Sequence, residues 1–306
     1  MPTEIGKNIS LVLGSGGARG LAHIGVIRWL EEHHYTVSSI SGCSIGSLVG
    51  GIYAAGKLTE FEQWVRAINK LDILALIDFS WSSSGLVKGD KIINTLTELV
   101  GDVLIEDLPM RYTAVAADIA NEKEVWMNSG RLFDAIRASI SLPLFFTPYN
   151  HNGVKLIDGG VLNPVPIAPT FGDATDLTLA VNLGGAVNKD KIAVTPIKEQ
   201  KSVDAILVGK VRQFIENLGN STNRINNVQW DAYDVANQAF DAMQSTISRQ
   251  KLAAYPPDVS IDIARNACGT LEFDRAEEMI ELGYTLCEEN LSLSKNGKHA
   301  FSGVQS

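Results

Sequence analysis

Two segments decide the fold of this 306-residue chain: ISLVLGSGGARG at residues 9–20 and SSISGCSIGSLVGGIYAA at residues 38–55. In each, a short apolar run typical of a buried strand leads into a glycine-rich loop and then into a helical pattern. The first helix is expected at residues 21–32 and the second at residues 47–55. This repeated order predicts an α/β fold, a parallel sheet with crossover helices.

Working outward from these segments, the pattern predicts further elements along the chain. Helices are expected at 60–69, 90–100, 129–139 with Ser129 as the cap, 203–218, 232–252 and 274–289. Strands are expected at 112–117, 124–127, 145–149, 154–157, 177–181 and 259–263. Asn152-Gly153 is a strong hairpin signal between two of these strands. Residues 184–201 show no period and are expected to form a mobile loop.

The composition is that of an ordinary globular chain, with 45% hydrophobic and 20% charged residues. A net charge of −9 argues against nucleic acid as a partner, because no basic stripe is available to neutralise phosphates. The same charge argues against tight docking on anionic lipid and leaves brief contact with a membrane surface open.

The chain shows no sign of a leader, a membrane span or a metal site. Residues 1–8 are polar, and no apolar run approaches the roughly 18 residues of a membrane span. Cys43, Cys268 and Cys287 have neither disulfide nor metal-ligand spacing. We expect a cytoplasmic protein without a metal or cofactor. One domain over 1–306 is expected, with its core at 9–183, a helical portion at 202–290 and a polar tail at 291–306.

The stretch Gly42-Cys43-Ser44-Ile45-Gly46 has the G-x-S-x-G spacing that presents a serine on a strand-to-helix turn. The flanking glycines keep the turn free of side chains, and the start of the following helix favours negative charge. Ser44 is therefore a candidate nucleophile. The alternative is a helix-capping serine in an ordinary turn, since this short pattern also arises by chance.

The stretch from Gly14 to Gly20 is a candidate oxyanion hole, because flexible backbone at Gly16, Gly17 and Ala18 can turn its amides toward one point. A dinucleotide-binding loop is disfavoured, since Arg19 stands where that motif requires its third glycine. We expect the Arg19 side chain to brace the loop through hydrogen bonds, with contact to a substrate headgroup as the alternative.

A proton acceptor for Ser44 is harder to find among the five histidines. His33 and His34 lie in a polar stretch and His299 in the tail, while His23 reads as a loop-bracing residue. His151 belongs to the hairpin tip, about 13 Å of strand away from Asp158. Asp158, at the end of a buried strand and followed by two glycines, is the candidate base; a turn-capping aspartate is the alternative.

Four ordered blocks make the chain resemble the patatin-like phospholipase family, in particular its bacterial branch related to neuropathy-target-esterase-type lysophospholipases. They are Gly14 to Gly20, Gly42 to Gly46, Ala138-Ser139-Ile140-Ser141-Leu142-Pro143, and Asp158-Gly159-Gly160.

The resemblance implies a patatin-like three-layer sandwich whose mainly parallel central sheet is flanked by helices. It also implies a dyad of nucleophile Ser44 and base Asp158 without histidine, and oxyanion-hole amides at Gly16, Gly17 and Arg19, with Ala18 between them. The block from Ser139 to Pro143 would shape the loop near the site. Plant patatins carry Asp-Gly where this chain has Gly14-Ser15, a departure that favours the bacterial branch.

The resulting expectation is a serine acyl hydrolase that cleaves fatty-acyl esters of phospholipids or lysophospholipids through an acyl-enzyme. Three alternatives remain beside it: a general carboxylesterase, including a histidine-dependent one; a regulatory or scaffold protein that kept the fold with little turnover; and a nucleotide-binding module. Residues 71–81 are either core or the border of an acyl pocket, and residues 232–252 either cover the site or mediate formation of a homo-oligomer.

Overall fold

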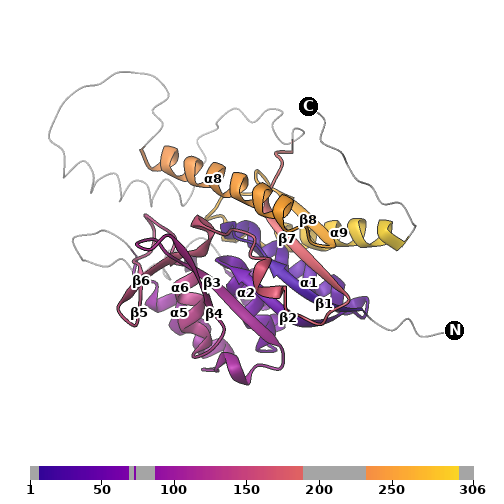
Figure 1. Ribbon diagram of the computed structural model, residues 1–306, viewed down its shortest axis with the longest axis horizontal. Coiled ribbons are helices and arrows are strands. Elements are labelled where there is room, and N and C mark those ends of the chain that lie inside the picture. The colour runs from indigo at the N-terminus through magenta and orange to yellow at the C-terminus, as the bar shows by residue number, and fades with distance from the viewer. Residues whose placement is uncertain (1–6, 69–71, 74–86, 189–231, 296–306) are drawn as a thin grey trace, which may run out of the picture.

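An eight-stranded mixed sheet runs through the structure (Figure 1). The computed structural model describes residues 7–68, 72–73, 87–188 and 232–295. The strand order across the sheet is β5-β6-β3-β2-β1-β7-β8, and β4 pairs with β3 outside this path. In chain order the strands are β1 (Asn8–Leu13), β2 (Thr36–Cys43), β3 (Arg111–Asp118), β4 (Lys123–Met127), β5 (Tyr149–His151), β6 (Val154–Asp158), β7 (Leu177–Gly185) and β8 (Val259–Ala264).

The central strands are parallel, as the repeated strand–loop–helix pattern predicted. Strands β3, β2, β1, β7 and β8 pair in parallel, whereas β4, β5 and β6 join as antiparallel neighbours. The hairpin between β5 and β6 turns at Asn152 and Gly153, both of which have positive φ, as a tight two-residue turn requires. The α/β class and the mainly parallel central sheet expected from the sequence are confirmed by this arrangement.

Helices cover the sheet. They are α1 (Ala22–Glu32), α2 (Ile45–Ala54), α3 (Leu58–Ala67), α5 (Asp90–Val100), α6 (Leu132–Ser139), α8 (Ala232–Ala254) and α9 (Ala276–Lys295). Short 3₁₀ helices are η1 (Gly17–Leu21), η2 (Ile105–Asp107), η3 (Gly159–Val161), η4 (Ala168–Thr170) and η6 (Phe273–Arg275).

The two faces of the sheet bury different clusters, because successive strand residues point to opposite sides. One face packs into the main core with residues of α1, α2 and α9, and it includes Leu11, Leu13, Leu179 and Val181. Val12 and Ala180 face the other way and pack with Val165, Ile167 and, from α8, Leu252. Figure 1 shows α9 beside α1, and α8 as a separate long helix that reaches β7.

Among the boundaries that differ from the sequence-based expectation, those of α6 and β5 have a clear local cause. Helix α6 begins at Leu132, and Ser129 does not cap it, because Gly130 with a φ of 86° turns the chain between them. Strand β5 starts at Tyr149 and not at Phe145, since Pro148 has no N–H to donate to a ladder. Phe145 and Phe146 pack against each other edge to face instead.

The C-terminal boundaries also differ. Helix α9 runs to Lys295, so the predicted polar tail at 291–306 begins too early; Leu291 is buried and holds this turn against the core. Gly184 and Gly185, expected in a loop, belong to β7, where Gly185 pairs with Ala264 of β8. The sheet thus extends beyond the predicted core at 9–183, and the single-domain assignment stays a prediction.

Several expectations fall outside the described residues: the helix at 203–218, residues 189–201 of the expected loop, and nearly all of 71–81. Within the described part of the chain, no helix is both long enough and apolar enough to span a membrane.

Candidate active site

Ser44 occupies a sharp turn between β2, which ends at Cys43, and α2, which begins at Ile45. Its φ of 55° and ψ of −125° are disfavoured for a side-chain-bearing residue, a strain on the order of 1–3 kcal/mol that the surrounding packing must hold. The two flanking glycines make the turn feasible. A Cβ on Gly46 would lie 2.1 Å from the Leu13 carbonyl oxygen, and one on Gly42 would lie 2.6 Å from that of Gly46.

Asp158 reaches the same end of the sheet from β6. The register pairs Cys43 with Val115 across β2 and β3, and Ala116 with Asp158 across β3 and β6. Neighbouring positions of β3 therefore place the two chain segments side by side, although 114 residues separate them. The Ser44 hydroxyl donates a short hydrogen bond of 2.5 Å to Asp158 Oδ2.

Burial dominates the electrostatics of Asp158. Its side chain is fully buried, and burial raises the pKa of the carboxyl from 3.8 to about 6. Hydrogen bonds that favour the charged form lower the pKa, but they do not outweigh the effect of burial. Those bonds come from Ser44 at Oδ2, from the Gly160 N–H at 2.8 Å to Oδ1, and weakly from the Cys43 thiol. The carboxylate is a stronger base than an exposed aspartate and is still largely ionised at pH 7.

Two serines, one at the end of α6 and one just after it, support this pair. The Ser44 N–H donates to the Ser139 hydroxyl at 2.9 Å, and that hydroxyl donates to the Val115 carbonyl at 2.6 Å. The Asp158 N–H donates to the Ser141 carbonyl oxygen at 2.9 Å. These residues therefore support the site by accepting hydrogen bonds from the backbone N–H groups of both Ser44 and Asp158. No spacing in the sequence indicated these contacts.

The glycine-rich loop faces Ser44, and Gly17 lines the same pocket as Ser44. Gly17 has a φ of 59°, and a Cβ there would lie 2.4 Å from the Thr270 carbonyl oxygen. Ala18 does not fit the predicted donor set in this conformation, because its N–H already donates to that same oxygen at 2.9 Å. No described residue accepts a hydrogen bond from the N–H of Gly16 or Gly17, so these two amides are the better candidates, and the Arg19 amide stays a prediction.

The Arg19 side chain braces the loop, as expected, and does not face the pocket. Its guanidinium donates to the Arg265 carbonyl at 3.0 Å and the Cys268 carbonyl at 3.4 Å, and it pairs with Asp241 of α8 at 3.2 Å. The side chain is only 4% exposed. These contacts disfavour the alternative in which Arg19 binds a substrate headgroup.

No histidine within the described residues contacts Ser44 or Asp158. His23 is buried and hydrogen-bonded through Nε2 to the Gly14 carbonyl at 2.9 Å, and burial lowers its pKa to about 4, so it stays neutral while it supports the loop. His151 lies in β5 opposite Val154, four residues along β6 from Asp158. Burial raises the pKa of the Cys43 thiol, which leaves it a packing residue with a weak hydrogen bond to Asp158.

Comparison with known proteins gives a match to the family model described as patatin-like phospholipase, over residues 11–171. The chain belongs to the patatin-like phospholipase family. An uncharacterized NTE family protein of Mycobacterium tuberculosis is 36% identical, with 92% of this chain and 91% of that protein covered. Membership of this family supports the assignment of the chain as a lipid ester hydrolase.

More distant relatives are much longer proteins. The lysophospholipase NTE1 of Candida glabrata is 27% identical over 91% of this chain, which spans only 16% of that protein's length. The Saccharomyces cerevisiae NTE1 is 33% identical over 59% of this chain and 11% of its own length. Among solved structures, VipD from Legionella pneumophila matches with a TM-score of 0.42 and 14% identity, covering 94% of this chain and 68% of VipD.

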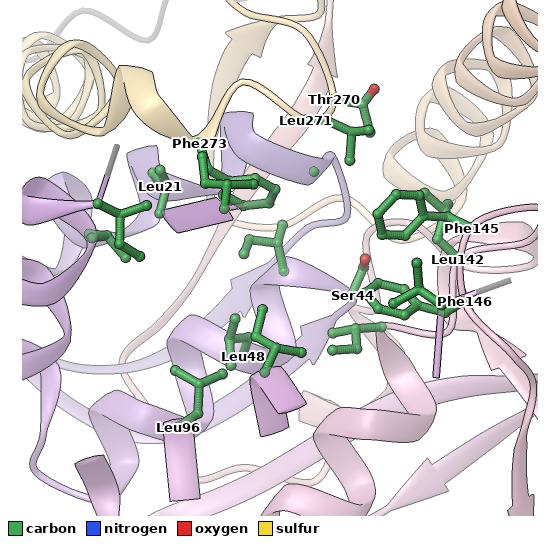
Figure 2. A pocket seen from close by; sticks show the side chains of 18 of the residues that line it. Leu21, Ser44, Leu48, Leu96, Leu142, Phe145, Phe146, Thr270, Leu271 and Phe273 are labelled. Carbon is green, nitrogen blue, oxygen red and sulfur yellow. The ribbon is translucent and has the colours of Figure 1, made fainter. Parts of the chain in front are cut away.

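An apolar cavity opens beside Ser44 in this member of the family. Its volume is about 150 Å³, and its lining contains no charged side chain among the described residues. Figure 2 shows the Ser44 hydroxyl near Phe145 and Phe146, with Thr270 and Leu271 on one side of the cavity and Leu48 and Leu96 on the other. The walls come from α2, α3, α5, η1, η6 and the loop after α6. Such a wall suits a hydrocarbon chain, because it offers apolar contact and no partner for a charge.

The sequence leaves residues 71–81 open between a core segment and the border of an acyl pocket. Only Asp72 and Ile73 of this stretch are described, and Ile73 lines the cavity. The described residues also contain no group of three or more His, Cys, Asp and Glu side chains arranged to hold a metal ion.

Proposed function

We propose that this protein is a serine acyl hydrolase that cleaves fatty-acyl esters of phospholipids or lysophospholipids, with Ser44 as nucleophile and Asp158 as its base. The observation that carries the proposal is the 2.5 Å hydrogen bond between the two side chains, beside an apolar cavity. Family membership supports the same class of reaction.

The first half-reaction forms an acyl-enzyme. As the Ser44 Oγ attacks the ester carbonyl carbon, the hydroxyl proton passes to Asp158 Oδ2, already within hydrogen-bond reach. The C–O bond to the alcohol then breaks, and the alcohol leaves with the proton from Asp158. Because burial raises the pKa of Asp158 to about 6, the carboxyl can both take up and return this proton near neutral pH.

The second half-reaction returns the free enzyme. Water gives a proton to Asp158, and its oxygen attacks the acyl carbon; when the ester bond to Ser44 breaks, Oγ takes the proton back and the fatty acid is released. In both halves the negative charge on the carbonyl oxygen needs fixed donors. The N–H groups of Gly16 and Gly17, which donate to no acceptor in the described part of the chain, would supply them together with the positive end of α2 behind Ser44.

The lipid class follows from the cavity and the relatives. An engineered apolar cavity of about 150 Å³ in another protein holds one benzene molecule, so this one accommodates a short length of hydrocarbon next to the scissile ester. The yeast relatives are named lysophospholipases, and we extend that substrate class to this chain as part of the proposal. Brief membrane contact and self-association stay predictions.

The Ser44→Ala variant tests the proposal, with the rate of ester hydrolysis as the measurement. Hydrolysis of lysophosphatidylcholine and p-nitrophenyl butyrate should fall at least about 10³-fold without loss of thermal stability, and a fluorophosphonate should label only the Ser44 peptide. His151→Ala is the matched control and should keep parental activity.

The remaining outcomes separate the alternatives. Activity on the nitrophenyl ester alone would favour a general carboxylesterase. Absence of turnover and labelling in a folded parent protein would favour a scaffold role. Unchanged hydrolysis in a clean preparation of Ser44→Ala would remove Ser44 as the nucleophile.

A further inference from the structure

Helix α8 packs against β7 and η3 and buries several polar side chains. Gln244, Ser245 and Ser248 are all buried, and they lie on one side of the helix at spacings of one and four residues. A helix on a globular protein ordinarily buries an apolar stripe. Buried polar side chains are the informative exception, because each must find a specific partner.

Helix α8 contacts the glycine-rich loop through one of these buried side chains, Gln244, and through the partly exposed Asp241. The Gln244 side-chain amide donates to the Ser15 hydroxyl at 3.1 Å, and Asp241, one helical turn earlier, pairs with Arg19 at 3.2 Å. Ser15 directly precedes Gly16, and Arg19 follows Gly17 by two residues. Helix α8 therefore holds the loop on both sides of Gly16 and Gly17, the two proposed oxyanion donors.

The same side chain approaches the base. A Cβ on Gly160 would lie 2.1 Å from the Gln244 amide nitrogen, 2.7 Å from Ser15 Oγ and 3.0 Å from Asp158 Oδ1. Gly160 also donates its N–H to Asp158. The absence of a side chain at this position leaves room for Gln244 between the loop and the turn that carries Asp158.

We propose that Asp241 and Gln244 are positioning residues: from α8 they fix the glycine-rich loop so that the Gly16 and Gly17 amides face the oxygen of the substrate carbonyl at Ser44. The inference rests on the proposed function. Its physical basis is that adjacent glycines have wide backbone freedom, whereas oxyanion donors act only when held within about 0.5 Å of their working positions.

Three variants test this assignment. Gln244→Met keeps the size of the side chain and removes its donor, and Asp241→Ala removes the acceptor for Arg19; the two are also combined. Lys251→Met is the matched control, because it breaks another anchor of α8, the 2.8 Å ion pair with Glu124 on β4, without touching the loop.

Kinetics on p-nitrophenyl butyrate give the first measurement. In the combined variant kcat should fall about 10- to 100-fold with KM within about twofold, since an interaction used in the transition state is lost. Lys251→Met should change neither value by more than about twofold. An equal loss in Lys251→Met would overturn the assignment, because general docking of α8 would then explain it.

Hydrogen exchange gives the second measurement and does not depend on turnover. The Ser15 and Ala18 amides are hydrogen-bonded to Pro164 and Thr270, so their exchange reports opening of the loop. Exchange in a peptide covering residues 14–20 should be about tenfold faster in the combined variant and unchanged in Lys251→Met. Unchanged exchange in the combined variant overturns the positioning role. If exchange is faster in the combined variant but the parent protein hydrolyses no ester, the positioning role stands and the proposed function is overturned.

Discussion

At the scale of single residues, Asp158 is the decisive group of the proposal, because it is buried and the proposed mechanism requires it to be charged. Burial raises its pKa, and the hydrogen bonds from Ser44 and Gly160 oppose that rise without cancelling it. Two measurable consequences follow, one for catalysis and one for stability.

The pH profile of activity should show an acid limb with an apparent pKa near 6. Below this pH the protonated Asp158 cannot accept the Ser44 proton, so kcat/KM should fall about tenfold per pH unit. Initial rates on an uncharged ester between pH 4 and 8 measure the limb. A limb near pH 4, or none, would contradict the assignment of Asp158 as base.

Asp158→Asn should lose nearly all activity. Its free energy of unfolding should increase relative to that of the parent protein as the pH rises. The folded-state pKa of Asp158 lies above its unfolded value of 3.8, so the native state holds the proton more tightly between pH 4 and 6. Stability from this group is therefore present at low pH and is lost as the pH rises through about 6, by ~3 kcal/mol for a shift of about two units.

Urea unfolding at pH 4 and pH 7 measures this difference. The free energy of unfolding of Asp158→Asn minus that of the parent should increase between the two pH values. An unchanged or decreasing difference would show that burial does not set the pKa of Asp158.

At the scale of elements, the strained turn at Ser44 depends on what its neighbours supply. Helix α6 ends at Ser139, whose hydroxyl takes the Ser44 N–H, and the residues just beyond it take the Asp158 N–H. The block from Ser139 to Pro143 thus holds both members of the pair through their backbones.

Ser139→Ala should cost about 1–3 kcal/mol of unfolding free energy, because it leaves the buried Ser44 N–H without an acceptor. It should also lower kcat, since the turn loses a support. Ser129→Ala is the control: this serine is exposed and caps no helix, so its effect should stay within about 0.5 kcal/mol. Thermal and chemical unfolding of the two variants compare them directly; equal effects would refute the role of Ser139.

At the scale of the whole molecule, the cavity is assembled from segments spread along most of the chain. Leu96 of α5 lines it and is fully buried, far in sequence from Ser44. Enlarging this side chain reduces the space for hydrocarbon, at a packing cost of about 1–3 kcal/mol.

Leu96→Phe should lower kcat/KM about tenfold more for a long-chain nitrophenyl ester than for the butyrate. The control is Leu104→Phe, at an exposed leucine that does not line the cavity. Both esters are measured with parent and variants. An equal effect on the two chain lengths would mean that the acyl chain does not enter past Leu96.

The sequence by itself determined the parallel core, the turn at Ser44 and the hairpin at Asn152-Gly153, because strand period, glycine spacing and turn chemistry are local properties of the chain. It also indicated Asp158, through its place at a strand end and through the family's ordered blocks. The start of α6 was missed, because the positive φ of Gly130 overrode the capping signal of Ser129.

Only the tertiary structure decided what depends on residues distant along the chain. Sheet register brings Asp158 to Ser44, the Thr270 carbonyl takes the Ala18 amide out of the donor set, and α8 reaches Ser15 and Arg19 from more than 200 residues away. The physical reason is that burial and hydrogen-bond partners are set by packing, and the raised pKa of Asp158 exists only once the surrounding core excludes water from its carboxylate.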